Sequence, residues 1–297
     1  MSAGRADREH EAMSEPLILC AVADDEHASD VVATGRSLAE AGPCRLLFVH
    51  VLEPILPPHA AAMPAAAATM RDTYAPARLE EAARARAAEV LVEAGVAEDD
   101  RVLVETGGAS RLIRQAADEH DAALVVLGSR RQGAVMSALR GSVSRALARD
   151  CPRPVLIAQE GRRPGGGPVV CGVQRDDTAS RRAVRVAGRL AGMLGRRLVL
   201  AHVLAPRGES DPALTQGAYA LLDSVREGGE AVGVELAVLE GSTTPQLEGL
   251  AHRLEASLLV IGSHGTGAVR AAVAGTVSLE LTRESTRPLV IVPEMAA

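Results

Sequence analysis

The sequence predicts two tandem doubly wound α/β domains, each built around a five-stranded parallel sheet. Short apolar runs alternate with amphipathic stretches along the chain, which is typical of strands separated by helices. The same succession occurs twice, so that the residues around Val22 align without a gap with those around Val173. Because the runs are almost continuously apolar, helices should cover both faces of each sheet, and right-handed crossovers complete the topology.

Each half contains five candidate strands. We expect them at 17–22, 45–51, 101–104, 123–127 and 155–158 in the first half, and at 169–173, 197–203, 235–239, 258–261 and 289–292 in the second. Amphipathic stretches between the strands predict helices, among others at 29–40, 78–93, 110–119 and 142–149. The second strands end on matching segments, His50-Val51-Leu52 and His202-Val203-Leu204, which supports the duplication.

A stretch rich in glycine and proline separates the two halves. Because these residues cannot continue a helix or a central strand, we expect a linker at 161–168. The remaining boundaries are then a disordered N-terminal tail at 1–14, a first domain at 15–160 and a second domain at 169–294. The tail lacks the apolar stretch of a signal peptide, and no run of about 18 apolar residues occurs. We therefore expect a cytoplasmic protein.

The composition excludes several functions. Aromatic residues are 1% of the chain and tryptophan is missing, so no aromatic surface can stack bases. The net charge is −6 without a long basic stretch, so neither nucleic acid nor a membrane is an expected partner. The cysteines form no CxxC pair, and we interpret Cys20 and Cys171 as buried structural residues of a protein in a reducing compartment. No cluster has the spacing of metal ligands.

A glycine pattern follows the fourth strand of each half. In the second half, Gly262-Ser263-His264-Gly265 is followed after nine residues by Gly275-Thr276-Val277-Ser278. In the first half, Gly128-Ser129-Arg130-Arg131 is followed after nine residues by Gly141-Ser142-Val143-Ser144. Glycine between a strand and a helix lets the backbone approach a phosphate, and the N–H groups of the helix start point toward it. Both patterns begin where doubly wound sheets bind ligands, at the carboxyl end of a strand.

Two interpretations of the second pattern are open. Either the backbone around Gly262 and Gly265 wraps phosphate oxygens while Thr276 and Ser278 donate hydroxyls, or Thr276 is the N-cap of a tight strand-to-helix turn. The pattern is neither GxxxxGK[ST] nor GxGxxG. No lysine follows the last glycine, so no catalytic residue for phosphoryl transfer is assigned.

The spacing G-x-x-G, nine residues, G-[ST] resembles the ATP-binding signature of the universal stress protein (UspA) family. The apolar first strands and the Arg-Pro-Val-Leu-Ile type of last strand agree with it over about Pro16 to Pro293. The resemblance implies a Rossmann-like, adenine-nucleotide α-hydrolase-like fold in tandem. It also implies that ATP, with or without Mg²⁺, lies with its triphosphate on the glycine motif and its adenine near the ends of the first and second strands, where Val203 stands.

The resemblance further implies how the halves pair. They should pack as the two subunits of the family's dimer do, with the last strands near a pseudo-twofold axis. A homodimer of the whole chain is left open.

The chain departs from the family after the first strand. ATP-binding members usually carry an Asp there that contacts the ribose, whereas the matching positions here are Ala23 and Gln174. Either a shifted loop brings Asp25 or Asp176 to the ribose, or these acids form a solvated turn that caps the next helix. The acids that follow within three residues are Asp24, Asp25, Asp176 and Asp177.

Arg131 is the second departure, because it stands where the first pattern should have its second glycine. A glycine with positive φ cannot become arginine without strain. Arg130 and Arg131 either pair with phosphates, fill the site or face solvent, so we expect nucleotide binding chiefly in the second half. His264 either bonds a phosphate or faces solvent, and His50 and His202 should pack or bond the backbone rather than bind metal.

Our first hypothesis is a stress-response sensor or regulator that binds ATP. The alternative is a non-nucleotide-binding interaction module or scaffold of the same fold. An enzyme would need a nucleophile or an acid–base pair near the motif, so at most slow ATP hydrolysis is expected. The candidate cofactor-binding residues are Gly262, Ser263, His264, Gly265, Gly275, Thr276, Val277, Ser278, Asp176 and Val203 in the second half, and Gly128, Arg131, Gly141 and Ser142 in the first.

Overall fold

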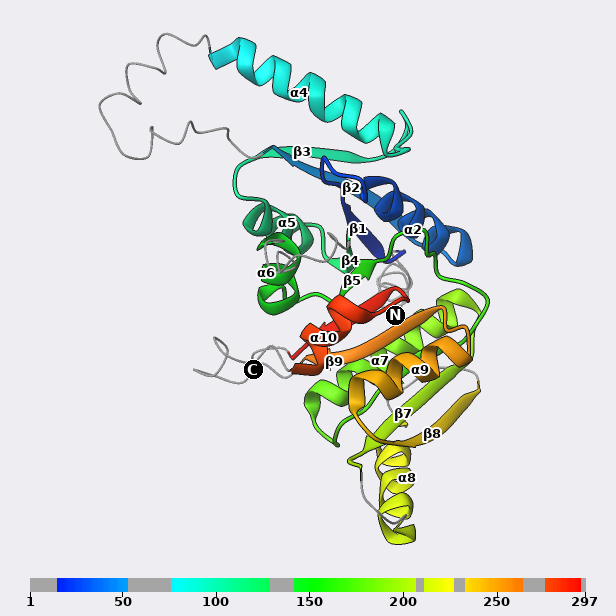
Figure 1. Ribbon diagram of the computed structural model, residues 1–297. Coiled ribbons are helices and arrows are strands. Elements are labelled where there is room, and N and C mark those ends of the chain that lie inside the picture. Colours follow the sequence, from blue (N-terminus) through cyan, green and yellow to red (C-terminus); the bar gives the residue numbers. More distant parts are fainter. Residues whose placement is uncertain are drawn as a thin grey trace, which may run out of the picture.

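The protein folds around one continuous ten-stranded sheet (Figure 1). The computed structural model describes residues 15–52, 76–128, 142–206, 211–226, 233–263 and 276–294. The predicted tail at 1–14 lies outside this part of the chain, as do Arg130, Arg131, Gly141, His264, Gly265 and Gly275. The strand order is β3-β2-β1-β4-β5-β10-β9-β6-β7-β8, so each half keeps the same internal order.

All ten predicted strands form, with ends within two residues of those expected. β1 and β10 are buried along their whole length, because helices cover both faces of the sheet. The strands are β1 (Leu17–Ala21), β2 (Arg45–Leu52), β3 (Val102–Thr106), β4 (Ala122–Gly128), β5 (Val155–Ala158), β6 (Val169–Gly172), β7 (Leu198–Leu204), β8 (Val234–Glu240), β9 (Leu258–Ser263) and β10 (Leu289–Pro293).

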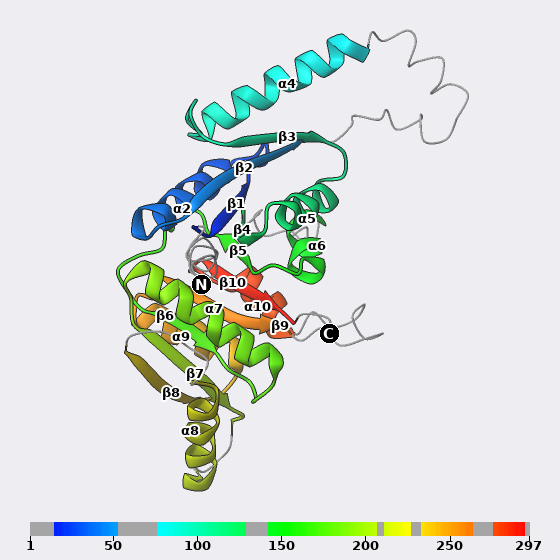
Figure 2. The same ribbon diagram turned by 180° about the vertical axis from the view of Figure 1, so that it is seen from behind.

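The helices form two layers, one on each face of the sheet (Figures 1 and 2). Alternate residues of a strand point to opposite layers, so Ile18 and Cys20 join one core and Leu17 and Leu19 the other. The first layer holds α2 (Ala28–Ala41), α4 (Pro76–Glu93), α7 (Thr178–Leu194) and α8 (Pro212–Arg226). The second holds α5 (Ala109–Glu119), α6 (Ser142–Asp150), α9 (Thr243–Arg253) and α10 (Thr276–Glu284).

The two halves meet where β5 pairs with β10. This pair is antiparallel, with Val290 opposite Leu156, whereas the other neighbouring pairs among the described strands are parallel. The prediction that the last strands lie together is therefore confirmed. Because the strands of the two halves run in opposite directions, their carboxyl ends lie at opposite edges of the sheet. We call these edges the first rim, at the ends of β1 and β4, and the second rim, at the ends of β6 and β9.

The segment between the halves is tied to both of them. The Gly161 N–H donates to the Asp30 carboxylate of α2 at 3.0 Å, and the Pro168 carbonyl accepts from the backbone N–H of Ser257 at 2.9 Å. A Cβ at Gly167 would lie 2.0 Å from the Glu255 carbonyl oxygen, so only glycine fits there. The boundaries at 160 and 169 stay a prediction, although β5 ends and β6 begins close to them.

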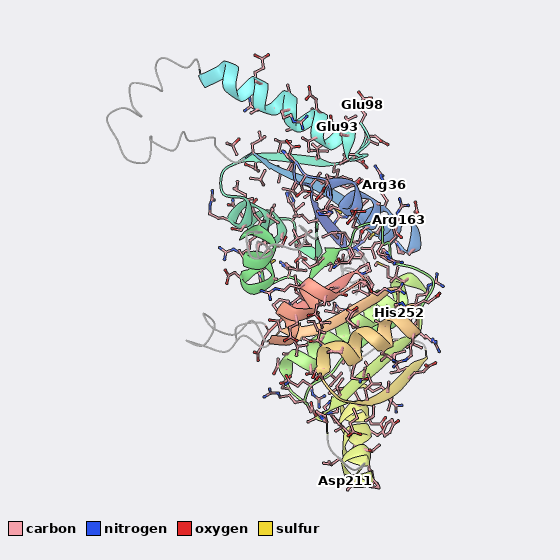
Figure 3. All side chains as sticks on the ribbon, viewed as in Figure 1. Arg36, Glu93, Glu98, Arg163, Asp211 and His252 are labelled. Atoms are coloured by element: carbon pink, nitrogen blue, oxygen red, sulfur yellow. The ribbon has the colours of Figure 1, made fainter. Side chains whose placement is uncertain are left out.

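Charged side chains lie at the outer parts of the molecule. Glu93 and Glu98 stand at one end and Asp211 at the other, and all three are exposed (Figure 3). Within the described residues, no helix is long and apolar enough to cross a membrane.

Candidate functional site

The first and last residues of the intact glycine pattern lie at the second rim. Gly262 and Ser263 are the last residues of β9, and Thr276 is the first residue of α10. The strand order reverses here, because β7 lies on one side of β6 and β9 on the other. Ligands of doubly wound sheets bind at such a switch point. The segment between, with His264, Gly265 and Gly275, lies outside the described residues.

Gly262 packs closely against the helix that follows β6. A Cβ on this residue would come within 3.1 Å of the Ala179 carbonyl oxygen, in the first turn of α7. Gly128 stands in the same place in the first half, where a Cβ would lie 3.1 Å from the Cβ of His27. Neither glycine has a positive φ. The first glycine of each pattern therefore lets the helix after the first strand settle against the fourth strand, and this accounts for its presence in both halves.

The helix starts that follow the patterns are similar in the two halves. α10 begins at Thr276 and α6 at Ser142, so both place backbone N–H groups near a rim. Val277 packs against the second core, and the Ser278 side chain is 8% exposed. In the first half, the Ser144 hydroxyl donates to the Gly128 carbonyl at 3.4 Å. Val277 thus anchors the helix start through packing.

The two histidines at the ends of the second strands bond to the backbone, as expected. Nδ1 of His50 lies 2.8 Å from the Val22 carbonyl oxygen, and Nδ1 of His202 lies 2.8 Å from that of Val173. Since a carbonyl only accepts, Nδ1 carries the proton in both. These equivalent bonds place Ala23 and Gln174 at corresponding positions. Val203, next to His202, is half-buried against the second core.

Asp176 and Asp177 have different roles in the second half. The Asp177 side chain accepts from the Ser180 N–H at 2.9 Å and caps α7, as the capping interpretation expects. The Asp176 carboxylate accepts from Arg181 at 2.6 and 2.8 Å, and the Ser224 hydroxyl of α8 lies 3.1 Å from this carboxylate and 2.7 Å from the Leu221 carbonyl. Hydrogen bonding from Arg181 lowers the pKa of Asp176. This carboxylate is therefore ionised and already occupied by internal donors.

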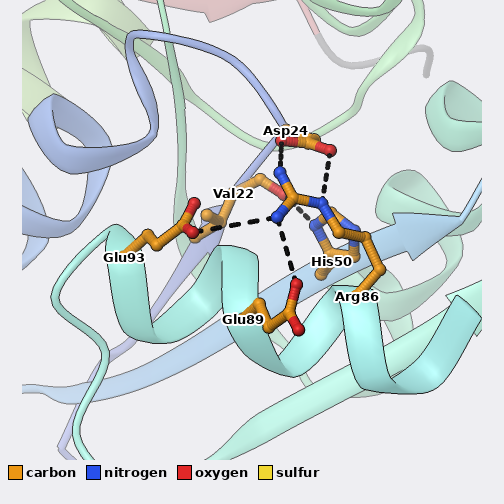
Figure 4. Close-up of polar contacts among 6 residues, drawn as sticks. All are labelled: Val22, Asp24, His50, Arg86, Glu89 and Glu93. Atoms are coloured by element: carbon orange, nitrogen blue, oxygen red, sulfur yellow. Dashed lines mark hydrogen bonds and ion pairs between the residues drawn. The ribbon is translucent and has the colours of Figure 1, made fainter. Parts of the chain in front are cut away.

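Asp24 is held in a comparable way in the first half (Figure 4). Its carboxylate accepts from Nη2 of Arg86 at 2.9 Å and from Nε at 3.3 Å, so α4 is tied to the loop after β1. Glu89 and Glu93 lie 3.3 and 3.8 Å from the same guanidinium. The Asp24 carboxylate, helped by Glu89, raises the pKa of Arg86.

No sequence pattern points to this pair, because Arg86 stands 62 residues from Asp24. Asp25 takes part in the turn before α2, because its carboxylate accepts from the His27 N–H at 3.0 Å. In the part of the chain that the structure describes, no three His, Cys, Asp or Glu residues are grouped so that they can hold a metal ion.

Comparison with known proteins agrees with the duplicated architecture. A model of the universal stress protein family matches residues 17–159 and 167–293. A universal stress protein of Thermus aquaticus is 34% identical over 142 residues, which is 48% of this chain and 97% of the relative. The crystal structure of a universal stress protein from Archaeoglobus fulgidus aligns with a TM-score of 0.63 at 18% identity, over 94% of this chain and 96% of the other.

One further solved structure is a universal stress protein in complex with cAMP. It is 27% identical and covers 44% of this chain and 100% of its own, with a TM-score of 0.37.

Proposed function

This chain belongs to the universal stress protein family, and we propose that it binds ATP at the second rim and acts as a sensor or regulator of a stress response in the cytoplasm. One observation carries the proposal: the intact glycine pattern stands between the end of a parallel strand and the start of a helix, at the point where the strand order reverses. A glycine motif is informative only in such a context.

The triphosphate would lie over the end of β9 and the start of α10. The unpaired N–H groups and the partial positive charge of a helix start favour an anion there. Gly265 and Gly275, which lie outside the described residues, would let the backbone approach the phosphate oxygens. The adenine would lie near the ends of β6 and β7, beside Val203. A Mg²⁺ ion would enter with the phosphates.

Among the described residues that follow β6, the carboxylates of Asp176 and Asp177 both already accept hydrogen bonds from protein groups. Asp176 would have to exchange its bonds from Arg181 for bonds from the ribose hydroxyls, and Gln174 stands two residues after the end of β6. We expect this to weaken ATP binding without preventing it, because the glycine motif acts on the other end of the nucleotide. Among the described residues, no nucleophile with a partnered base lies at the rim, which favours a regulator over a fast enzyme.

Calorimetric titration with ATP and Mg²⁺ tests the proposal. The wild-type protein should bind one ATP per chain, and Gly265→Arg, which copies the first half, should abolish binding. Arg131→Gly is the matched control, because it changes the equivalent position at the opposite rim and should leave the affinity of the second site unchanged. Absence of binding by the wild type at millimolar ATP would contradict the proposal.

A second function is favoured by the acidic residues after the first strand of each half. Asp24 pairs with Arg86 and Asp176 pairs with Arg181, so neither carboxylate is offered to a ribose. If these pairs persist, the chain would act as a non-nucleotide-binding interaction module or scaffold. A stoichiometric partner recovered in a pull-down, equally with and without ATP, would favour this alternative. Native mass spectrometry of the purified protein distinguishes the two functions, because a co-purified nucleotide would support ATP binding.

A further inference from the structure

β3 lies at one outer edge of the sheet, because among the described strands it pairs only with β2 (Figure 1). The Arg101 carbonyl accepts from the Phe48 N–H at 2.9 Å, and the Gly107 N–H donates to the Leu52 carbonyl at 2.9 Å. Successive residues of a strand direct their backbone N–H and C=O groups to alternate sides. The backbone groups of the even-numbered residues of β3, from 102 to 106, therefore face away from β2 and toward the open edge.

One face of this edge is apolar and uncovered. Val102 pairs with Phe48 of the first core and is 40% exposed, and Val104 on the same face is 37% exposed. By the registers of β2–β3 and β7–β8, the equivalent residues of the second half are Leu236 and Val238, which are half-buried against the first core. The reason is that α8 packs on both β7 and β8, whereas α4 packs mainly on β2 and α2.

The opposite face of β3 carries one cation and one anion. Arg101 precedes the strand and Glu105 follows four residues later, on the same face as Leu103, which packs against the second core. At about 3.3 Å per residue, the Cα atoms of Arg101 and Glu105 lie roughly 13 Å apart. Neither side chain forms an ion pair with another described residue. Both charges therefore stay available to a second strand laid along the edge.

One antiparallel register matches all of these features in two copies of the chain. With Leu103 of each copy on a two-fold axis, Val102 of one copy lies opposite Val104 of the other, and Arg101 lies opposite Glu105. The two valines are residues whose backbone groups face the edge, so they form the hydrogen-bonded pairs of the ladder. Arg101 and Glu105 then form non-hydrogen-bonded pairs, in which side chains lie closer together and opposite charges stabilise the pairing.

The neighbouring registers lack this match. Moving the axis to Val102 or to Val104 would place Leu103 opposite Arg101 or Glu105, so that each charge faces an apolar side chain. The register about Leu103 is therefore selected by charge complementarity. The same kind of joint already exists inside the chain, since β5 and β10 pair antiparallel over three residues each.

We propose that the β3 edge is a self-association surface, on which a second copy of this chain pairs its own β3 in antiparallel direction about Leu103. The inference does not depend on nucleotide binding. Pairing would satisfy the outward backbone groups, cover Val102 and Val104 of both copies and bring the charges together. The strand contains no proline or lysine, the residues that commonly protect an edge from such pairing.

Sedimentation equilibrium of the full chain over a range of concentrations tests the proposal. The wild type should form dimers and no larger species. Arg101→Glu and Glu105→Arg each place like charges opposite one another, so each should weaken dimerisation about tenfold or more. The double variant Arg101→Glu/Glu105→Arg should recover it, because opposite charges face each other again. An equimolar mixture of the two single variants should recover it for the same reason.

Two further variants separate pairing from folding. Val104→Pro removes an N–H that faces the open edge, a place where a strand tolerates proline, so the monomer should fold while dimerisation is lost. If this variant does not fold, the charge variants still decide. Arg189→Glu is the matched control, because it makes the same charge change at an exposed position of α7 and should leave dimerisation unchanged.

Oxidative cross-linking reports the register. Leu103→Cys places two thiols opposite each other on the axis, at a Cα separation that a disulfide can span, and should give covalent dimers. Val102→Cys is the control, because its own copy lies on the diagonal about 7–8 Å away and should cross-link poorly. Cross-linking of Val102→Cys in preference to Leu103→Cys would overturn the register.

Two results overturn the proposal as a whole. The first is a wild-type chain that stays monomeric up to millimolar concentration, whatever other strand its edge accepts. The second is a dimer that keeps its affinity in Val104→Pro and in both single charge variants, since that dimer would form through another surface.

Discussion

Gly42, at the end of α2, packs directly against Met193 of α7. A Cβ on Gly42 would lie 2.7 Å from Cγ of Met193 and 2.9 Å from its carbonyl oxygen. The φ of Gly42 is −166°, an extended value open to any residue, so space alone requires glycine here. The halves therefore share a packed helix contact in addition to the β5–β10 pair.

Gly42→Ala should destabilise both halves together. The methionine side chain can move, but its carbonyl cannot, so α2 and α7 must separate at a cost of about 1–3 kcal/mol. We expect a lower midpoint in a single cooperative denaturant transition. Gly192→Ala is the control on α7, since a Cβ there meets nothing within 4 Å and should stabilise the helix. Two separate transitions in Gly42→Ala would show that the halves unfold independently.

The pair formed by Asp24 and Arg86 should hold α4 against the loop after β1. Asp24→Asn and Arg86→Gln remove the same contact, and each should speed amide hydrogen exchange in α4 while the central strands stay protected. Higher salt should have the same effect on the wild type, because the pair is exposed and screened. Glu93→Gln is the control, since that carboxylate lies 3.8 Å from the guanidinium. Unchanged exchange in α4 would refute the role of the pair.

Alkaline pH should destabilise the protein through its buried thiols. Burial raises the pKa of Cys171 from 9.0 to about 12 and raises that of Cys20 as well. The thiol of the unfolded chain loses its proton above pH 9, whereas the folded one keeps it until about pH 12. The stabilisation is complete below pH 9 and is lost between pH 9 and 12.

Urea unfolding of Cys171→Ala across this range measures the effect. The urea midpoint of Cys171→Ala should fall less steeply with pH than the midpoint of the wild type. Cys44 lies at a half-buried site, so Cys44→Ala should change this pH dependence less than Cys171→Ala does. Equal slopes in the wild type and Cys171→Ala would contradict the assignment.

Local patterns predicted the fold well because each strand depends on its own apolar run. Strand β5 forms at Val155–Ala158, as expected, and the pairing of last strands followed from the family resemblance. The burial of Cys20 and Cys171 was also predicted, since both stand within such runs. Strand β9 ends at Ser263, two residues later than expected, because its pairing with β10 continues to Pro293. The sequence of β9 alone does not contain this information.

The candidate site was predicted less completely, because its contacts join distant segments. Gly262 suggested close approach of a phosphate, but its packing against Ala179 depends on where α7 lies. Arg86 stands in an ordinary helical pattern, and its bonds to Asp24 arise only from the folded arrangement. The N-cap role of Asp177 could be predicted from the sequence, since an acid just before a helix is a common cap.

The antiparallel β5–β10 pair has a consequence for stoichiometry. A dimer assembled from separate chains would have to sort like from unlike subunits, and its composition would vary with concentration. Here one polypeptide supplies both partners, so every molecule carries one glycine pattern with Arg131 and one with Gly265, in a ratio that dilution cannot alter. Covalent fusion thus allows the two glycine patterns to diverge while each half keeps the other as its partner within the same chain.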